Sequence, residues 1–305
     1  MTLAEQKKAH ASLLGLECLQ CALKQVINTT ALVGMPEEKR KALMQRAFEL
    51  IARKGIDRNN CEVIDEAYRL VTAEIGDENP YRQVKYDFNE GMLRLCPEVR
   101  SHIRESADPL AAAVRASIAG NLIDIVALGM DVTMDAAMAK VREVDKTGLY
   151  IDHCAALAEA LSKARTLLVL GDNCGEIAMD KLLIETIREL YPDIRVQYGV
   201  RGASVVNDVT RDDAAQVGME EVAEIIDNGD SMLTTQPHRA SAEFNHAFDA
   251  ADVVISKGMG NYEGLHFCDR PNLFFLLIAK CDVIARLTGA PKGSILCIEK
   301  GRGAE

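Results

Sequence analysis

The sequence has no long run of apolar residues. None approaches the roughly 18 residues that a helix needs to cross a membrane, and the run Leu273–Ala279 is typical of a buried strand. The first residues lack the apolar core of a signal peptide, so we expect a cytoplasmic protein with no membrane partner. Basic residues are not in excess either. The formal net charge is −11, which argues against a nucleic-acid binder.

The chain also lacks the signs of a disulfide framework. Its nine cysteines are an odd number scattered over 305 residues, as is typical of reduced thiols. Cys18 and Cys21 form one CxxC pair, with no second pair or His pair at zinc-finger spacing. Cys61, Cys268 or Cys281 could complete a metal site in space. A redox pair would prefer a strand-to-helix context, and two neighbouring buried thiols are the commoner outcome.

Helical patterns fill the first half of the chain. Apolar residues recur at helical spacing after Pro36 and after Asn60, and both residues are typical of helix starts. Pro109 begins another expected helix, and an Ala- and Leu-rich helix is expected over 152–164. The first half is therefore predicted to be almost wholly helical.

From about Thr166, short β-rich runs alternate with helical ones. The expected strands are 166–171, 194–200, 222–226, 252–256, 273–279 and 294–298. The expected helices are 175–190, 212–218, 239–249 and 281–288. This alternation predicts an α/β fold with a mostly parallel, doubly wound sheet. The change of pattern places a boundary near residues 150–165.

Polar residues follow two of the expected strands. Asp172 and Asn173 come directly after the first, and Asp208 comes after the second. Ligands of open α/β sheets bind at the carboxyl ends of strands. Two carboxylates and one amide there could hold a hard cation such as Mg²⁺ and leave positions for water and a phosphate oxygen. The alternative is that Asp172 only caps a helix, which is the role we expect for Asp212 and Asp213.

A Gly-rich turn follows the strand that ends near Ser256. Gly258 and Gly260 would let backbone N–H groups approach a phosphate, and Lys257 would neutralise its charge. The segment is not a Walker motif, because its spacing and the position of its lysine differ. Arg201 is a second, weaker candidate for a phosphate-binding cation.

Four further residues have two interpretations each. Glu176 is either a favourable charge in the first turn of a helix or a catalytic group. Cys174 is a packing residue rather than a nucleophile, because no His neighbours it in sequence. Asn121 and Asp124, in the helical half, either reach the site or satisfy buried backbone groups.

Four blocks of sequence, in this order, resemble the signatures of one family. They are Gly120-Asn-Leu-Ile-Asp124, Gly171-Asp-Asn-Cys-Gly-Glu176, Asn207-Asp208-Val-Thr210 and Lys257-Gly-Met-Gly-Asn-Tyr-Glu263. Over about residues 15–300 the chain is similar to the metal-dependent damage-control phosphatases, an ARMT-like group formerly called domain of unknown function 89. The CxxC pair and Leu276–Cys281 resemble the prokaryotic branch.

The resemblance implies a helical region over residues 1–160 and a Rossmann-like three-layer αβα sandwich over residues 161–305. It also implies a phosphatase that acts on small phosphorylated metabolites with a divalent cation, Mg²⁺, Mn²⁺, Co²⁺ or Ni²⁺. By motif match the metal ligands are Asp172, Asn173 and Asp208, and Lys257 contacts the phosphate. The other predicted substrate-binding residues are Asn121, Glu176, Arg201, Gly258, Gly260 and Asn261.

The predicted reaction is phosphomonoester hydrolysis, in which water or Asp172 attacks phosphorus. The catalytic residues are then Asp172, Asp208 and Lys257. One alternative is an S-adenosylmethionine-dependent methyltransferase, although its glycine-rich loop is not evident. Another is a non-catalytic protein that binds a phosphorylated metabolite, or a metal through Cys18 and Cys21. The substrate is left open, and so is a homo-oligomer.

Overall fold

A seven-stranded sheet forms the centre of the molecule, in the order β1-β7-β6-β5-β2-β3-β4. The computed structural model describes residues 16–54, 60–121 and 134–302. The strands are β1 (Ile151–Asp152), β2 (Thr166–Leu170), β3 (Arg195–Val200), β4 (Glu224–Asp227), β5 (Val253–Lys257), β6 (Leu273–Ile278) and β7 (Ile295–Glu299). All neighbouring strands are parallel except β6 and β7. The predicted α/β fold with a mostly parallel sheet is confirmed.

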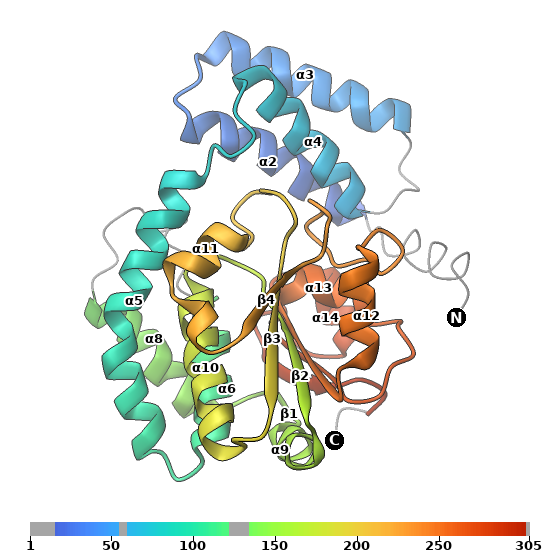
Figure 1. The fold of residues 1–305 in the computed structure, drawn as a ribbon. Coiled ribbons are helices and arrows are strands. Elements are labelled where there is room, and N and C mark those ends of the chain that lie inside the picture. The colour runs from blue at the N-terminus through green and yellow to red at the C-terminus, as the bar shows by residue number, and fades with distance from the viewer. Residues whose placement is uncertain (1–15, 55–59, 122–133, 303–305) are drawn as a thin grey trace.

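Helices cover both faces of this sheet (Figure 1). One face carries α5 (Arg82–Glu105), α6 (Pro109–Ala119), α8 (Met134–Thr147), α9 (Cys154–Lys163), α10 (Glu176–Leu190) and α11 (Arg211–Gln216). The other face carries α12 (Ala242–Ala250), α13 (Gly258–Leu265) and α14 (Asp282–Thr288). A short 3-10 turn, η2 (Met219–Glu221), precedes β4. Within the described residues, no helix has both the length and the apolar character that crossing a membrane requires.

The remaining helices form a separate bundle at one end of the molecule (Figure 1). They are η1 (Leu16–Cys18), α2 (Leu19–Leu32), α3 (Glu37–Lys54) and α4 (Asn60–Ile75). Ala22 and Val26 of α2, Leu43 of α3 and Ala67 of α4 belong to an apolar cluster of their own. The bundle therefore has its own small core and lies beside the sheet rather than on one of its faces.

Successive side chains of each strand point to opposite faces, as strand geometry requires. Leu167 and Val169 of β2 join the apolar cluster on the α10 side, whereas Leu168 and Leu170 join the cluster on the α13 side. A parallel sheet that is covered on both faces needs apolar residues at every position. This explains why β2 and β6 read as unbroken apolar runs in the sequence.

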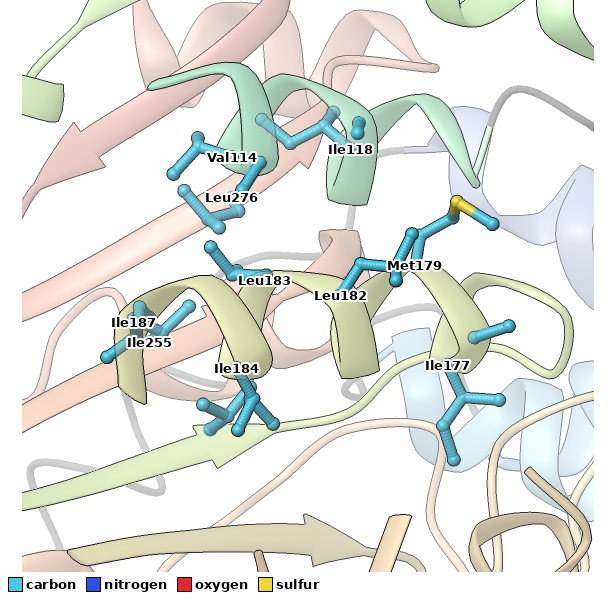
Figure 2. Packing of buried hydrophobic residues seen from close by; sticks show 14 of the residues in the cluster. Val114, Ile118, Ile177, Met179, Leu182, Leu183, Ile184, Ile187, Ile255 and Leu276 are labelled. Carbon is cyan, nitrogen blue, oxygen red and sulfur yellow. The ribbon is translucent and has the colours of Figure 1, made fainter. Parts of the chain in front are cut away.

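Helices α10 and α6 lie side by side on the sheet, and Leu182 and Leu183 of α10 lie toward Val114 and Ile118 of α6 (Figure 2). All four side chains are buried. The cluster that contains them joins helices from both predicted regions into one core. In addition, β1 lies within the predicted helical region and pairs with β7. The division at residue 160 stays a prediction.

Every strand and helix expected after Thr166 is present, with ends shifted by a few residues. One expectation about the type of local structure was wrong. The segment expected as a Gly-rich turn is helix α13, which begins at Gly258 directly after β5. Glycine is a poor helix former, so sequence propensity pointed away from a helix. The helix is stabilised instead by its packing, because Tyr262 and Leu265 are buried against the sheet.

We expect Leu183→Ala to lower the free energy of unfolding by about 2–5 kcal/mol, because it removes a buried side chain and leaves a cavity. Leu190 lies on the same helix with 45% of its surface exposed. Leu190→Ala should therefore change the free energy by less than about 0.5 kcal/mol. Urea unfolding of both variants measures the difference. Two equally small effects would contradict the packing of α10 described here.

Candidate active site

The order of the strands places the predicted site residues at one edge of the sheet. From β2 the chain builds β3 and β4 on one side, and β5 and β6 on the other. Ligands bind at the carboxyl ends of strands where the order reverses in this way. Asp172 follows β2, Arg201 follows β3 and Lys257 ends β5, so all three lie at that position.

Backbone hydrogen bonds join the loops that follow β2 and β3. Asn173 and Asp208 form an isolated antiparallel bridge, and the backbone N–H of Val209 donates to the carbonyl of Asp172 at 3.0 Å. Nearby, Val206 has a φ of 46°, a conformation that β-branched residues rarely adopt and that often marks functional sites. The bridge brings the three predicted metal ligands together.

A cavity of about 270 Å³ opens between this edge of the sheet and the helical bundle. The predicted site residues that line it are Asn121, Asp172, Asn173, Asp208, Gly258 and Gly260. The predicted residues that do not line it are Glu176, Arg201, Lys257 and Asn261, and all four are buried. Asp124 lies outside the described residues. Six of the predicted site residues thus line the cavity, and four are buried behind its lining.

Asp172 is buried, with 8% of its surface exposed. The side-chain amide groups of Asn121 and Asn173 both donate to its Oδ2, at 3.0 Å and 2.6 Å. Burial, and then the charge of Asp208, raise the pKa of Asp172 to about 6. Burial also raises the pKa of Asp208. The positive charges nearby therefore balance these two buried carboxylates only in part.

Arg201 holds Asp208 in place and does not face the cavity. Its Nε donates to Oδ2 of Asp208 at 2.7 Å. The other guanidinium nitrogens donate to Thr235, to the carbonyl of Leu233 and to the side chain of Asn261, at 2.8–2.9 Å. The phosphate contact predicted for Arg201 stays a prediction. In this structure the guanidinium positions one of the predicted metal ligands.

Lys257 lies beneath the floor of the cavity. Its Nζ is fully buried and lies 2.5 Å from Oε1 of Glu176 and 2.5 Å from Oδ1 of Asp180. Burial disfavours the charge of Lys257, but the carboxylates of Asp180 and Glu176 outweigh it and raise the pKa of the lysine. Burial raises the pKa of Glu176 to about 7. In this structure the ammonium group of Lys257 contacts two carboxylates. Its predicted contact with phosphate stays a prediction.

Asp180 was missed by the sequence reasoning. It accepts from the hydroxyl groups of Tyr198 and Ser117 at 2.8 Å and 2.7 Å, in addition to Lys257. The available signal was its position in α10, four residues after Glu176. Residues at that spacing lie on the same side of a helix, and two acids there interrupt an otherwise apolar face.

Helix α5 connects the two loops that carry the predicted metal ligands. Lys85 donates to the backbone carbonyl of Asp208 at 2.8 Å and pairs with the carboxylate of Asp213 at 2.5 Å. One turn later, the side-chain oxygen of Asn89 accepts from the backbone N–H of Gly175 at 2.6 Å. Asn89 also donates to Asp213 at 3.2 Å. These buried contacts fix the β3 loop relative to the β2 loop.

Lys280 is the one cationic side chain among the described residues that line the cavity. It is exposed, and its Nζ donates to the backbone carbonyl of Asn121 at 3.2 Å. The sequence reasoning gave it no role. The signal was again a polar residue just beyond an apolar strand, because Lys280 follows β6 after Ala279.

The donor set at the floor of the cavity fits a hard divalent cation. Asp172 and Asp208 offer carboxylate oxygens, and Asn173 turns its amide nitrogen toward Asp172, so its amide oxygen is not used in that bond. Among the described residues, no three His, Cys, Asp or Glu side chains form a group that could hold a metal. A site here would need the amide together with water or substrate oxygens, as Mg²⁺ sites commonly do.

Comparison with known proteins identifies the family of this chain. A family model for the damage-control phosphatase ARMT1-like domain matches residues 15–296. The chain belongs to this family. A damage-control phosphatase from Pyrococcus horikoshii is 30% identical over 286 residues, which cover 92% of this chain and 96% of the relative. One from Archaeoglobus fulgidus is 29% identical over 281 residues, with 92% and 96% covered.

A solved structure is also similar to this member of the damage-control phosphatase family. The crystal structure of a DUF89 family protein from Pyrococcus horikoshii matches with a TM-score of 0.86 at 28% identity. The match covers 94% of this chain and 98% of that one. The resemblance expected from the four sequence blocks is thereby confirmed, and family membership supports a hydrolase of the phosphatase class.

Gly258 allows α13 of this damage-control phosphatase family member to begin against Asp172. Its φ is +76°, and a Cβ atom at this position would lie 1.9 Å from Oδ2 of Asp172. Gly289 has a similar φ of +70°, but a Cβ atom there would meet nothing within 4 Å. The two glycines therefore have the same backbone requirement, and only one is in close contact with the site.

We expect Gly258→Ala and Gly289→Ala to lower the free energy of unfolding alike through their backbone, by about 1–2 kcal/mol. Gly258→Ala should in addition reduce the rate of phosphate release about a hundredfold, because the carboxylate of Asp172 must move away. Gly289→Ala should leave that rate unchanged. Urea unfolding and a phosphate-release assay separate the two effects. Equal activity of the variants would show that the position of Asp172 does not matter.

Proposed function

We propose that this chain is a divalent-cation-dependent phosphatase that hydrolyses small phosphorylated metabolites, such as sugar phosphates or related phosphomonoesters. One observation supports this most. Asp172, Asn173 and Asp208 come from two separate strand ends and line one cavity, together with Lys280 and the first residues of α13. Membership of the damage-control phosphatase family, and the similarity to two archaeal proteins named damage-control phosphatases, support the same class of reaction.

Asp172, Asn173 and Asp208 are the residues that would hold the cation. A bound Mg²⁺, Mn²⁺, Co²⁺ or Ni²⁺ supplies a Lewis acid that polarises a phosphoryl oxygen. Asn121 donates to Asp172, Arg201 donates to Asp208, and the backbone bridge joins the two loops. The chain thus holds two carboxylates in fixed positions, which is the preorganisation that electrostatic catalysis requires.

The start of α13 and the side chain of Lys280 would bind the phosphate group. Gly258, Met259 and Gly260 line the cavity, and the first N–H groups of a helix have no acceptor within the helix. Such groups bind anions readily. Lys280 adds the positive charge that the cavity lining otherwise lacks. Phosphoryl transfer depends mainly on positioning and on charge stabilisation of this kind.

The size of the cavity favours a small substrate. Its volume is about 270 Å³, slightly below the roughly 300–1,000 Å³ of pockets that bind drug-sized ligands. Residues of the helical bundle form its outer wall, among them Gln25 and Ile64. A phosphorylated metabolite of a few carbon atoms suits this space better than a phosphoprotein does.

We expect Asp172→Asn to reduce the rate of phosphate release on the order of a hundredfold or more, because one charged group that stabilises the reaction is lost. The variant is nearly isosteric, so the fold should persist. The measurement is release of inorganic phosphate from a panel of sugar phosphates with each of the four cations. A chelator should abolish the wild-type rate, and an added cation should restore it.

Asp212→Asn is the matched control for this experiment. Asp212 lies close to Asp208 in sequence, is exposed and does not line the cavity. Its variant should release phosphate at the wild-type rate. Near-normal turnover of Asp172→Asn, with an unchanged unfolding midpoint, would mean that Asp172 is not a metal ligand. Full activity in the presence of the chelator would contradict the cation dependence itself.

We expect Lys280→Ala to lower kcat/KM about tenfold or more, because a hydrogen bond to a charged group contributes about 1.5–3 kcal/mol. Most of the change should be a higher KM, since Lys280 attracts the phosphate before and during the reaction. Lys292→Ala is the control, because Lys292 is exposed and does not line the cavity. Steady-state kinetics of both variants is the measurement. Identical constants for the two would exclude Lys280 from the phosphate site.

A further inference from the structure

One wall of the cavity is rich in thiols, and the phosphatase proposal does not use them. Cys18, Cys21, Cys61 and Cys281 line the cavity, four of the nine cysteines in the chain. They come from η1, α2, α4 and the residue before α14, so the fold gathers them from distant parts of the sequence. Cys268, which the sequence offered as another partner for the CxxC pair, does not line the cavity.

The CxxC pair occupies the first turn of a helix. Cys18 is the N-cap residue of α2, and Cys21 is the third residue of that helix. In an α-helix, Cα atoms three residues apart are about 5 Å apart, which lies within the roughly 4.4–6.8 Å that a disulfide spans. The 3-10 turn η1, which ends at Cys18, stands where a redox pair was expected to follow a strand. The pair nevertheless lies at the start of a helix, a position where reactive cysteines are found.

The surroundings distinguish this pair from the other two thiols. Cys21 is exposed, so a small oxidant can reach it, and Cys18 is 5% exposed. Cys61 is buried, and its thiol donates to the carboxyl group of Glu263 at 3.1 Å. Burial and Glu263 raise the pKa of Cys61 well above its usual value, so it is a poor nucleophile. Cys281 directly precedes α14, far from Cys21 in the sequence. Its distance from Cys21 is therefore not set by one turn of helix, as that of Cys18 is.

We propose that Cys18 and Cys21 form a reversible disulfide, which makes this wall of the cavity a redox-sensitive modification site. The oxidant is a small disulfide such as oxidised glutathione. The thiolate of Cys21 attacks one sulfur atom, forms a mixed disulfide and releases one small thiolate. The thiolate of Cys18 then attacks the Cys21 sulfur and releases the second small thiolate. Two protein thiols thus lose two electrons and two protons, and the small disulfide becomes two thiols.

No disulfide joins Cys18 and Cys21 in this structure. The structure has no disulfide among its nine cysteines, all of which lie in its described part. Burial, and then the charges of Cys281 and Glu263, raise the pKa of Cys21. Its thiol is therefore protonated near neutral pH, which slows its reaction with disulfides. Oxidation of the pair by a small disulfide is consequently slow near neutral pH.

The test uses the full chain, equilibrated with mixtures of reduced and oxidised glutathione. Remaining thiols are alkylated at low pH, and the chain is digested and analysed by mass spectrometry. We expect the peptide that contains Cys18 and Cys21 to lose two hydrogen atoms, in a fraction that rises with oxidised glutathione. Dithiothreitol should reverse the change. Cys18→Ser should stop the reaction at the mixed disulfide, so that glutathione stays attached to Cys21.

Cys96→Ser is the control variant, because Cys96 is a buried cysteine of α5 that does not line the cavity. It should form the disulfide as the wild type does. Three results would overturn the proposal: no oxidation at any ratio, a disulfide from Cys21 to Cys61 or Cys281, or a stoichiometric metal that thiol alkylation releases. None of these readouts depends on phosphatase activity, so the two proposals succeed or fail separately.

Discussion

Two buried carboxylates, Asp172 and Asp208, line one cavity at the ends of neighbouring strands, and the rest of the site is arranged around the cost of burying their charge. Leaving both charged and buried is costly, and the raised pKa of each shows that nearby cations compensate only in part. Arg201 pairs with Asp208, and Asn121 donates to Asp172. A divalent cation held by these carboxylates would supply the positive charge that is missing.

Such an arrangement persists only because other contacts prevent the two loops from moving apart. The Asn173–Asp208 bridge joins them directly. Lys85 and Asn89 of α5 each hold one of the loops, through the carbonyl of Asp208 and the N–H of Gly175. Rigid positioning of this kind means that little reorganisation is needed when charge develops in a reaction.

The charges behind the cavity floor have a different role. Lys257, Glu176 and Asp180 form a completely buried ionic group beneath Asn121 and Asp172. Buried ion pairs contribute little net stability, because desolvation offsets their attraction. Their value here is geometric: Glu176 also accepts from Asn121 at 2.6 Å, and Asn121 donates in turn to Asp172. The buried lysine thereby influences the site through its neighbours.

The sequence by itself determined most of the strands and helices after Thr166 and which three predicted metal ligands meet at one edge of the sheet. Carboxyl ends of parallel strands must meet at one edge of a sheet, so Asp172, Asn173 and Asp208 could be placed together from their positions after apolar runs. Most of the fold after Thr166 could be predicted for the same reason, since buried parallel strands are unbroken apolar runs. Helix α13 could not, because its glycines disfavour a helix and only packing against β6 stabilises it.

Only the tertiary structure decided which polar residues face the cavity. Lys257 ends a strand, and Arg201 and Lys280 follow strands, yet the first two are buried behind the floor and Lys280 lines the cavity. The difference arises from residues far away in sequence, Asp180 for Lys257 and Thr235 for Arg201. The same holds for the thiols, which α2, α4 and the start of α14 bring to one wall. Strand ends are local features of a sequence, whereas burial depends on which distant elements pack against them.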